Sequence, residues 1–238
     1  MSFNDNDEIL TIENLQIKYG AMPVLNDVSL KLKSGEIIAV MGTSGSGKST
    51  LLKAIMGLLP PKTQISGQIY FQGKQLLTLT EADYRKLRGK KIAYLWQNAV
   101  NYFCPWRKLG DQFREINEAH ANPLKLTAQE FEDYIQKLAT DFKLPINIGS
   151  YYPTELSGGM GARTGCLAAM LLRPSLILAD EPTAALDMVN SLQLADNLRQ
   201  MLNKAGVSVI LVTHDEAIAQ YTADRLLYLA SGRLTTVI

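Results

Sequence analysis

The sequence of 238 residues predicts an α/β fold in which helices cover a mostly parallel sheet. Helical patterns at about residues 48–56 and 188–204 alternate with short apolar runs, and this alternation is typical of parallel sheets. From Gln97 to Leu172 the alternation stops, which predicts an α-helical insert. The apolar runs that predict buried strands are residues 37–41, 92–95, 176–179 and 207–212.

Further strands are expected near both ends of the chain. Residues 9–17 fit a strand, and residues 28–33 alternate apolar and polar side chains as a half-buried strand does. Residues 67–71 predict another short strand. Residues 226–237 predict a terminal hairpin that turns at Ser231-Gly232.

The insert is expected to hold three helices. Residues 109–119 and 127–142 have apolar residues at helical spacing, and the second segment begins with a capping box. A third helix is expected to start at Ser157. The predicted division is a core of residues 1–97 and 173–238 and a helical subdomain of residues 98–172.

The composition narrows the possible functions. With 24 basic and 23 acidic residues, the chain lacks the basic excess of a nucleic-acid-binding surface. Cys104 and Cys166 are too few for a disulfide framework and have no metal-ligand spacing, so ordinary thiols are expected. The polar, acidic start is no signal peptide, and no apolar run approaches the ~20 residues of a membrane helix. We expect a chain that is soluble by itself and that other chains hold at any membrane.

Residues 42–49, Gly-Thr-Ser-Gly-Ser-Gly-Lys-Ser, match the phosphate-binding pattern GxxxxGK[ST] at every position. Such a loop aims backbone N–H groups at an anion, and the helix after it adds its positive end. Lys48 is expected to reach the β- and γ-phosphates, and Ser49 to offer its hydroxyl to Mg²⁺. The alternative, a flexible turn, fits poorly between a buried strand and a helix. The nucleotide-binding candidates are Gly42, Thr43, Ser44, Gly45, Ser46, Gly47, Lys48, Ser49 and Thr50.

Three polar residues follow other buried strands. Asp180 and Glu181 come at the end of the apolar run at 176–179, and His214 follows the run at 207–212. These positions lie at the carboxyl ends of the predicted strands, where ligands of open α/β folds bind. Asp180 is expected to hold Mg²⁺ through water, and Glu181 to act as the general base toward an attacking water. His214 is expected to donate to the γ-phosphate or to orient that water. The alternative for Asp180 and Glu181 is an acidic helix cap, and the alternative for His214 is a purely structural role.

Residues 156–160, Leu-Ser-Gly-Gly-Met, complete a pattern that resembles the nucleotide-binding subunits of ABC transporters over nearly the whole chain. The resemblance implies a P-loop NTPase (RecA-like) core with an N-terminal antiparallel β subdomain. The α-helical subdomain would carry the 156–160 signature. It also implies ATP and Mg²⁺ as cofactors and ATP hydrolysis as the activity. Gln97 matches the glutamine that senses the γ-phosphate and contacts Mg²⁺ in this family.

The resemblance implies roles for further residues. Ser157, Gly158 and Gly159 match the signature that binds the ATP held by a second subunit. Tyr19 matches the aromatic residue that stacks on adenine, and Asp187 lies in the loop that crosses the dimer interface. The alternatives are an ordinary helix cap at Ser157 and a strand-end aromatic at Tyr19.

Within the family, the chain looks like the branch that imports peptides, nickel or metal chelates, because of residues 87–92, residues 110–112 and Met160. The implied partners are a second ATP-binding subunit (the same or a sister chain), integral membrane permease subunits and an extracytoplasmic solute-binding protein, with no nucleic acid. The implied place is the cytoplasmic face of the inner membrane, as a peripheral subunit. The alternatives are the ATPase of an exporter or lipid transporter, a non-transport ABC ATPase acting on nucleic acid or ribosomes, and a regulatory subunit that hydrolyses ATP poorly.

Two segments depart from the family pattern. Gly161 and Gly165 stand where the family usually has an Arg- and Gln-rich stretch, and they lie on one helix face, where another backbone can come close. Tyr102, Phe103 and Trp106 form an unusually aromatic segment. These aromatic side chains either dock a membrane subunit or pack inside the insert.

Overall fold

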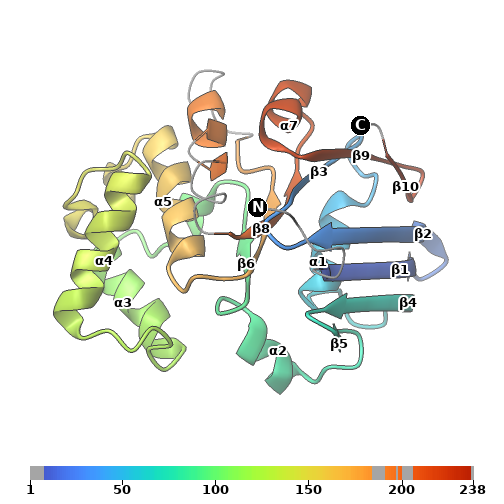
Figure 1. Ribbon diagram of the computed structural model, residues 1–238, viewed down its shortest axis with the longest axis horizontal. Helices are drawn as coiled ribbons and strands as arrows, with labels where there is room; N and C mark the ends of the chain where they lie inside the picture. Colours follow the sequence, from blue (N-terminus) through green and yellow to red (C-terminus); the bar gives the residue numbers. More distant parts are fainter. Residues whose placement is uncertain (1–7, 184–190, 197, 200–205, 237–238) are drawn as a thin grey trace.

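A six-stranded sheet crosses the middle of the molecule (Figure 1). The computed structural model describes residues 8–183, 191–196, 198–199 and 206–236. The strand order is β10-β9-β3-β8-β7-β6, and every neighbouring pair except β10-β9 is parallel. The sheet confirms the predicted α/β class and the predicted terminal hairpin. Its strands are β3 (Ile37–Met41), β6 (Ile92–Leu95), β7 (Leu176–Asp180), β8 (Ser208–Val212), β9 (Arg225–Ala230) and β10 (Arg233–Thr236).

A second sheet, in the order β2-β1-β4-β5, is antiparallel throughout. The three strands expected at residues 9–17, 28–33 and 67–71 are all present but longer than predicted. The largest difference is in β2, which begins at Met22 rather than at residue 28. This strand lies at the sheet edge, where an exposed Pro23 is tolerated. The strands are β1 (Glu8–Tyr19), β2 (Met22–Lys33), β4 (Gln64–Phe71) and β5 (Lys74–Gln75).

The helices confirm the predicted insert. In Figure 1, α3, α4 and α5 lie together on the left, whereas α1 lies on the right beside the antiparallel sheet. The helix predicted over residues 188–204 is helical at 191–196 and 198–199, and its other residues lie outside the described part of the chain. The helices are α1 (Lys48–Ile55), α2 (Glu81–Leu87), α3 (Leu109–Ala119), α4 (Ala128–Asp141), α5 (Gly158–Met170) and α7 (Glu216–Thr222), with the 3₁₀ helices η1 (Ala99–Tyr102), η2 (Ile148–Ser150) and η3 (Pro153–Glu155).

Opposite faces of the six-stranded sheet belong to two apolar cores. Successive residues of a strand point to opposite faces. Ile38 and Val40 of β3 therefore join the core formed with α1 and the antiparallel sheet. Ile37 joins the core that includes Phe113 of α3 and Leu167 of α5. The central sheet thus binds the helical insert to the rest of the chain, with the carboxyl ends of its parallel strands left free for a site.

The glycines of α5 accommodate the segment that follows β6. A Cβ atom at Gly165 would overlap the Cβ of Ala99 in η1, and one at Gly161 would lie 3.2 Å from the Cβ of Val100. The close approach expected on this helix face is confirmed, and the approaching segment is η1.

Both cysteines are free thiols. Burial raises the pKa of Cys166 to about 12, so this side chain stays a protonated thiol in the core.

Candidate functional site

Two glycines determine the path of the loop between β3 and α1. Gly42 and Gly47 have φ values of 153° and 106°, which side chains other than hydrogen rarely allow. A Cβ atom at Gly42 would overlap the carbonyl oxygen of Leu229, and one at Gly47 would lie 2.8 Å from Cδ2 of Leu25. Close packing therefore requires both glycines, while Thr43, Ser44 and Gly45 remain exposed on the outside of the loop.

Lys48 is buried at the start of α1, with only 6% of its surface exposed. Its Nζ donates to the carbonyl oxygens of Gly42 and Thr43 at 2.8 and 2.9 Å. A buried ammonium needs such acceptors, because burying an unpaired charge is costly. The side chain thus points back into the loop.

Ser49 and Asp180 converge from different elements. The hydroxyl of Ser49 in α1 donates to Oδ1 of Asp180 at 3.1 Å, and Asp180 ends β7. Oδ2 of Asp180 accepts a hydrogen bond of 2.8 Å from the hydroxyl of Tyr94 in β6. The sequence analysis singled out Ser49 and Asp180 but missed Tyr94. The only sequence feature that indicated Tyr94 was its hydroxyl group, on a residue one position before the end of a buried strand.

Glu181 and His214 meet where β7 and β8 end. His214 Nδ1 lies 3.4 Å from Glu181 Oε2, and the backbone N–H of Glu181 donates to the carbonyl of Val212 at 2.9 Å. Glu181 has a φ of 49°, which is uncommon for a residue other than glycine. This backbone conformation, directly before Pro182, costs energy and is maintained by the surrounding structure, as is common at functional sites. The His214 side chain is exposed to solvent.

Tyr19, at the end of β1, also reaches this region. Its hydroxyl lies 3.4 Å from Oγ1 of Thr50 in α1, which places the half-buried ring beside the phosphate loop. Gln97 lies two residues beyond the end of β6 and is exposed. The structure therefore brings together residues at or just after the ends of β1, β3, β7 and β8 and residues of the first turn of α1.

The signature residues do not join this site within one chain. Ser157 is the N-cap of α5, and its hydroxyl accepts a hydrogen bond of 3.3 Å from the N–H of Met160. Ser157 and Gly158 are exposed, and Figure 1 places α5 on the opposite side of the molecule from α1. Asp187 lies outside the described residues.

A glycine-rich cradle between a parallel strand and a helix, with a serine and an aspartate converging beside it, defines a P-loop NTPase. A family model described as ABC transporter matches residues 25–184. The chain belongs to the ABC transporter family and is one of its ATP-binding, ATP-hydrolysing subunits.

Relatives and solved structures agree with this membership. The oligopeptide transport ATP-binding protein OppD of Escherichia coli (strain K12) is 33% identical over 95% of this chain and 68% of its own length. The metal-staphylopine import system ATP-binding protein CntD of Staphylococcus aureus (strain NCTC 8325) is 34% identical over 95% of this chain and 84% of its own length. A dimeric, post-hydrolysis structure of the ATP-binding cassette MJ0796 with ADP and Pi has a TM-score of 0.81 and 26% identity, covering 96% of this chain and 99% of that one. Among the described residues, no helix combines the length and apolar character that crossing a membrane requires.

Proposed function

We propose that the phosphate loop, Lys48 and Tyr19 bind ATP, and that Ser49, Asp180 and Gln97 hold Mg²⁺ beside its phosphates. The hydroxyl of Ser49 and the carboxylate of Asp180 already face each other at 3.1 Å, and oxygen ligands of this kind suit Mg²⁺. The bound ion would neutralise charge on the phosphate oxygens. The ammonium of Lys48, which donates to the carbonyls of Gly42 and Thr43, lies within the loop and would donate to a bound phosphate.

Hydrolysis is assigned to the pair at the ends of β7 and β8. Glu181 accepts a proton from the attacking water, and His214 orients that water or donates to the γ-phosphate. Their separation of 3.4 Å supports this assignment, because the histidine can hold the carboxylate in place. No other described residue is needed for the proton transfer in this scheme.

The site is completed by a second ATP-binding subunit, either another copy or a sister chain. The N-terminus of α5 is exposed and includes Ser157, Gly158 and Gly159. Its backbone N–H groups would donate hydrogen bonds to the γ-phosphate of ATP bound by the partner subunit. The dimeric state of the MJ0796 cassette supports this arrangement. Asp187 is proposed to lie in the same interface.

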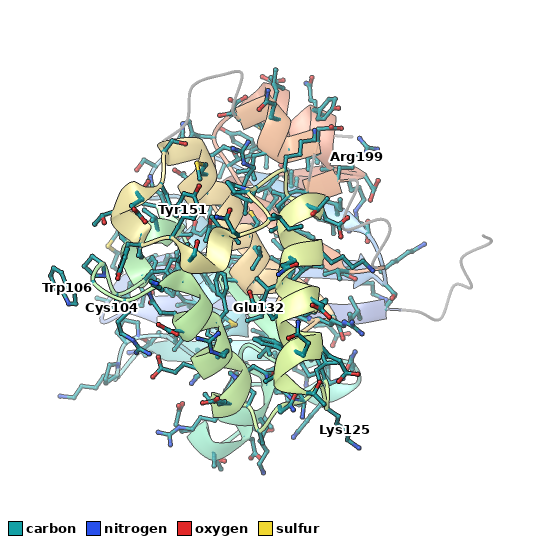
Figure 2. All side chains as sticks on the ribbon, turned by 90° about the vertical axis from the view of Figure 1, so that its left-hand side faces the viewer. Cys104, Trp106, Lys125, Glu132, Tyr151 and Arg199 are labelled. Atoms are coloured by element: carbon teal, nitrogen blue, oxygen red, sulfur yellow. The ribbon has the colours of Figure 1, made fainter. Side chains whose placement is uncertain are left out.

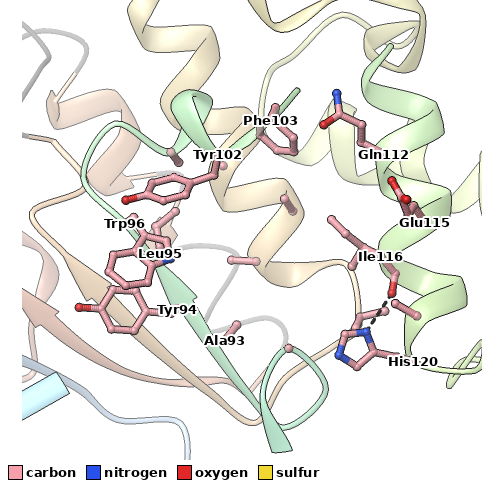
Figure 3. Close-up of a pocket in the computed structure, with 17 residues that line it drawn as sticks. Ala93, Tyr94, Leu95, Trp96, Tyr102, Phe103, Gln112, Glu115, Ile116 and His120 are labelled. Carbon is pink, nitrogen blue, oxygen red and sulfur yellow. Dashed lines mark hydrogen bonds between the residues drawn. The ribbon is translucent and has the colours of Figure 1, made fainter. Parts of the chain in front are cut away.

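Residues 98–172 are proposed to act as a subdomain that passes motion from the site to permease subunits. A groove of about 460 Å³ lies between β6, η1, α3 and α5, with mostly apolar walls (Figure 3). Tyr102 at its rim and nearby Trp106 are 63% and 81% exposed, and Figure 2 shows Trp106 projecting from the molecule. This surface suits a membrane subunit, so the chain would sit peripherally at the cytoplasmic face of the inner membrane.

The cargo is proposed to be a peptide or a metal chelate, delivered by an extracytoplasmic solute-binding protein. The names of OppD and CntD support these two classes. Nickel stays a prediction of the sequence pattern, as does the absence of nucleic acid among the partners. Export, lipid transport and a role on nucleic acid or ribosomes remain the alternatives against which the proposal is tested.

The convergence of Ser49 and Asp180 beside the phosphate loop carries the ATP-binding part of this proposal. The transport part is tested by purifying the chain from detergent-solubilised membranes and identifying its companions by mass spectrometry. We expect two multi-span proteins, an ATP-binding subunit and a solute-binding protein. Recovery from the soluble fraction with nucleic acid or ribosomes would contradict the transport role and leave only the ATPase chemistry.

A further inference from the structure

The carboxylate of Asp180 is bonded through both of its oxygens. Oδ1 accepts from Ser49 at 3.1 Å, and Oδ2 accepts from Tyr94 at 2.8 Å. A carboxylate held at both oxygens cannot turn about its terminal bond without losing a hydrogen bond. Tyr94 therefore helps to fix the orientation of the carboxylate plane beside Ser49.

Tyr94 is itself fixed by its neighbours. The register of β6 on β7 pairs Tyr94 with Leu178, two residues before Asp180. The ring centroids of Tyr94 and Trp96 are 4.0 Å apart with an interplanar angle of 32°, and Trp96 stacks on Tyr102 at 5.4 Å (Figure 3). Aromatic pairs at these distances stabilise each other. The hydroxyl is thus aimed by a strand pair and by a row of three rings.

The phenol is the donor in this pair, because a carboxylate only accepts hydrogen bonds and the hydroxyl of Tyr94 donates to Oδ2 of Asp180.

We propose that Tyr94 is a positioning residue of the magnesium site, which holds Asp180 in the orientation that the metal requires. This inference rests on the proposed function, because that function places Mg²⁺ beside Ser49 and Asp180. Groups that hydrogen-bond a metal-ligating carboxylate commonly set metal affinity, and their loss weakens binding by about 10- to 100-fold. The simpler interpretation is that the hydrogen bond from Tyr94 to Asp180 only links β6 to β7 and has no effect on metal binding.

The test measures metal binding rather than turnover. Mn²⁺ replaces Mg²⁺, and its binding to the purified full chain with ADP is followed by electron paramagnetic resonance. Tyr94→Phe keeps the stacked ring and removes only the hydroxyl. We expect its Mn²⁺ affinity to fall about tenfold, with ADP affinity in the absence of metal unchanged.

Tyr134→Phe is the matched control. Its hydroxyl donates to the carbonyl of Met170 at 3.4 Å, on the helical side of the molecule, so its removal should leave Mn²⁺ affinity unchanged. If Tyr94→Phe binds Mn²⁺ within twofold of the parent chain, while Asp180→Asn loses binding, Tyr94 is only a structural tie and the inference fails alone. If Asp180→Asn also keeps Mn²⁺ affinity, the proposed metal site is wrong and the inference fails with it.

Discussion

At the scale of single residues, the site is held by partners that the fold itself supplies. Lys48 donates to two loop carbonyls, Asp180 accepts from two hydroxyls, and Glu181 lies beside His214. Each charged group is therefore oriented before a nucleotide arrives. Such prior organisation is favourable, because little reorientation is needed when the phosphates bind.

Tyr19 is the residue whose role depends most on the resemblance. Tyr19→Ala should weaken ATP binding by roughly 5- to 150-fold, because stacking of a base on an aromatic ring contributes about 1–3 kcal/mol. Tyr19→Phe, which keeps the ring and loses the contact with Thr50, should stay within about threefold of the parent chain. Titration with a fluorescent ATP analogue measures both variants. An affinity of Tyr19→Ala within twofold of the parent would make Tyr19 an ordinary strand-end aromatic.

At this scale the sequence predicts residues of one continuous segment better than contacts between residues of different strands. The phosphate loop lies in one continuous segment, so its glycines and Lys48 were predicted directly. The contact of Tyr94 with Asp180 depends on β6 lying next to β7, and that of Glu181 with His214 on β7 lying next to β8. Strand order arises from the packing of the whole sheet, so a linear pattern does not contain it.

At the scale of elements, the fit between α5 and η1 explains the unusual glycines of the signature helix. Gly165 leaves room for Ala99, and η1 begins two residues after Gln97. The two elements are packed too closely to slide independently. A shift of the segment that contains Gln97 would therefore move the helix that presents the signature.

Gly165→Ala should destabilise the chain by about 1–2 kcal/mol, because overpacking against Ala99 outweighs the ~1 kcal/mol that alanine adds to helix stability. Gly161→Ala is the matched control, since its Cβ would meet Val100 at 3.2 Å and needs only a small adjustment. Chemical denaturation measures both changes. The double variant Gly165→Ala with Ala99→Gly should recover most of the loss. Absence of that recovery would show that the contact does not limit the packing.

The helices α2 and α7 were not predicted from the sequence, for a physical reason. α2 and α7 have seven residues each, which is too short for a 3.6-residue period to stand out. Their caps were the available signals, since Thr80 accepts from the N–H of Asp83 and Asp215 from that of Ile218. The longer helices and the buried strands were predicted because their patterns extend over enough residues.

At the scale of the whole molecule, one chain holds two separate halves of the proposed chemistry. The phosphate loop lies beside the antiparallel sheet, and the signature helix lies with α3 and α4 (Figure 1). Neither half can complete the other within the chain. A second subunit is therefore part of the proposal, as is the docking of permease subunits on the helical side.

The docking surface is tested by replacing Tyr102 and Trp106 with serine together. We expect the double variant to fold but to lose most of its co-purification with membrane subunits, because buried aromatic anchors dominate interfaces. Phe103 is left in place, since it packs edge-on against the buried Phe113 at 6.0 Å. Ile146→Ser is the control, because Ile146 is 60% exposed and also lies in the insert. Unchanged recovery of the membrane subunits in the double variant would rule this surface out.

The central claim is that Glu181 activates water for hydrolysis of ATP held at the phosphate loop. The most direct measurement compares bound ATP and turnover in the purified transport complex carrying either the parent chain or Glu181→Gln. Glu13→Gln, which changes an exposed carboxylate of β1, is the control. We expect Glu181→Gln to retain ATP and to lose at least about 100-fold in turnover, because the shape of the side chain stays while the base is removed. Near-normal turnover in Glu181→Gln would contradict the claim.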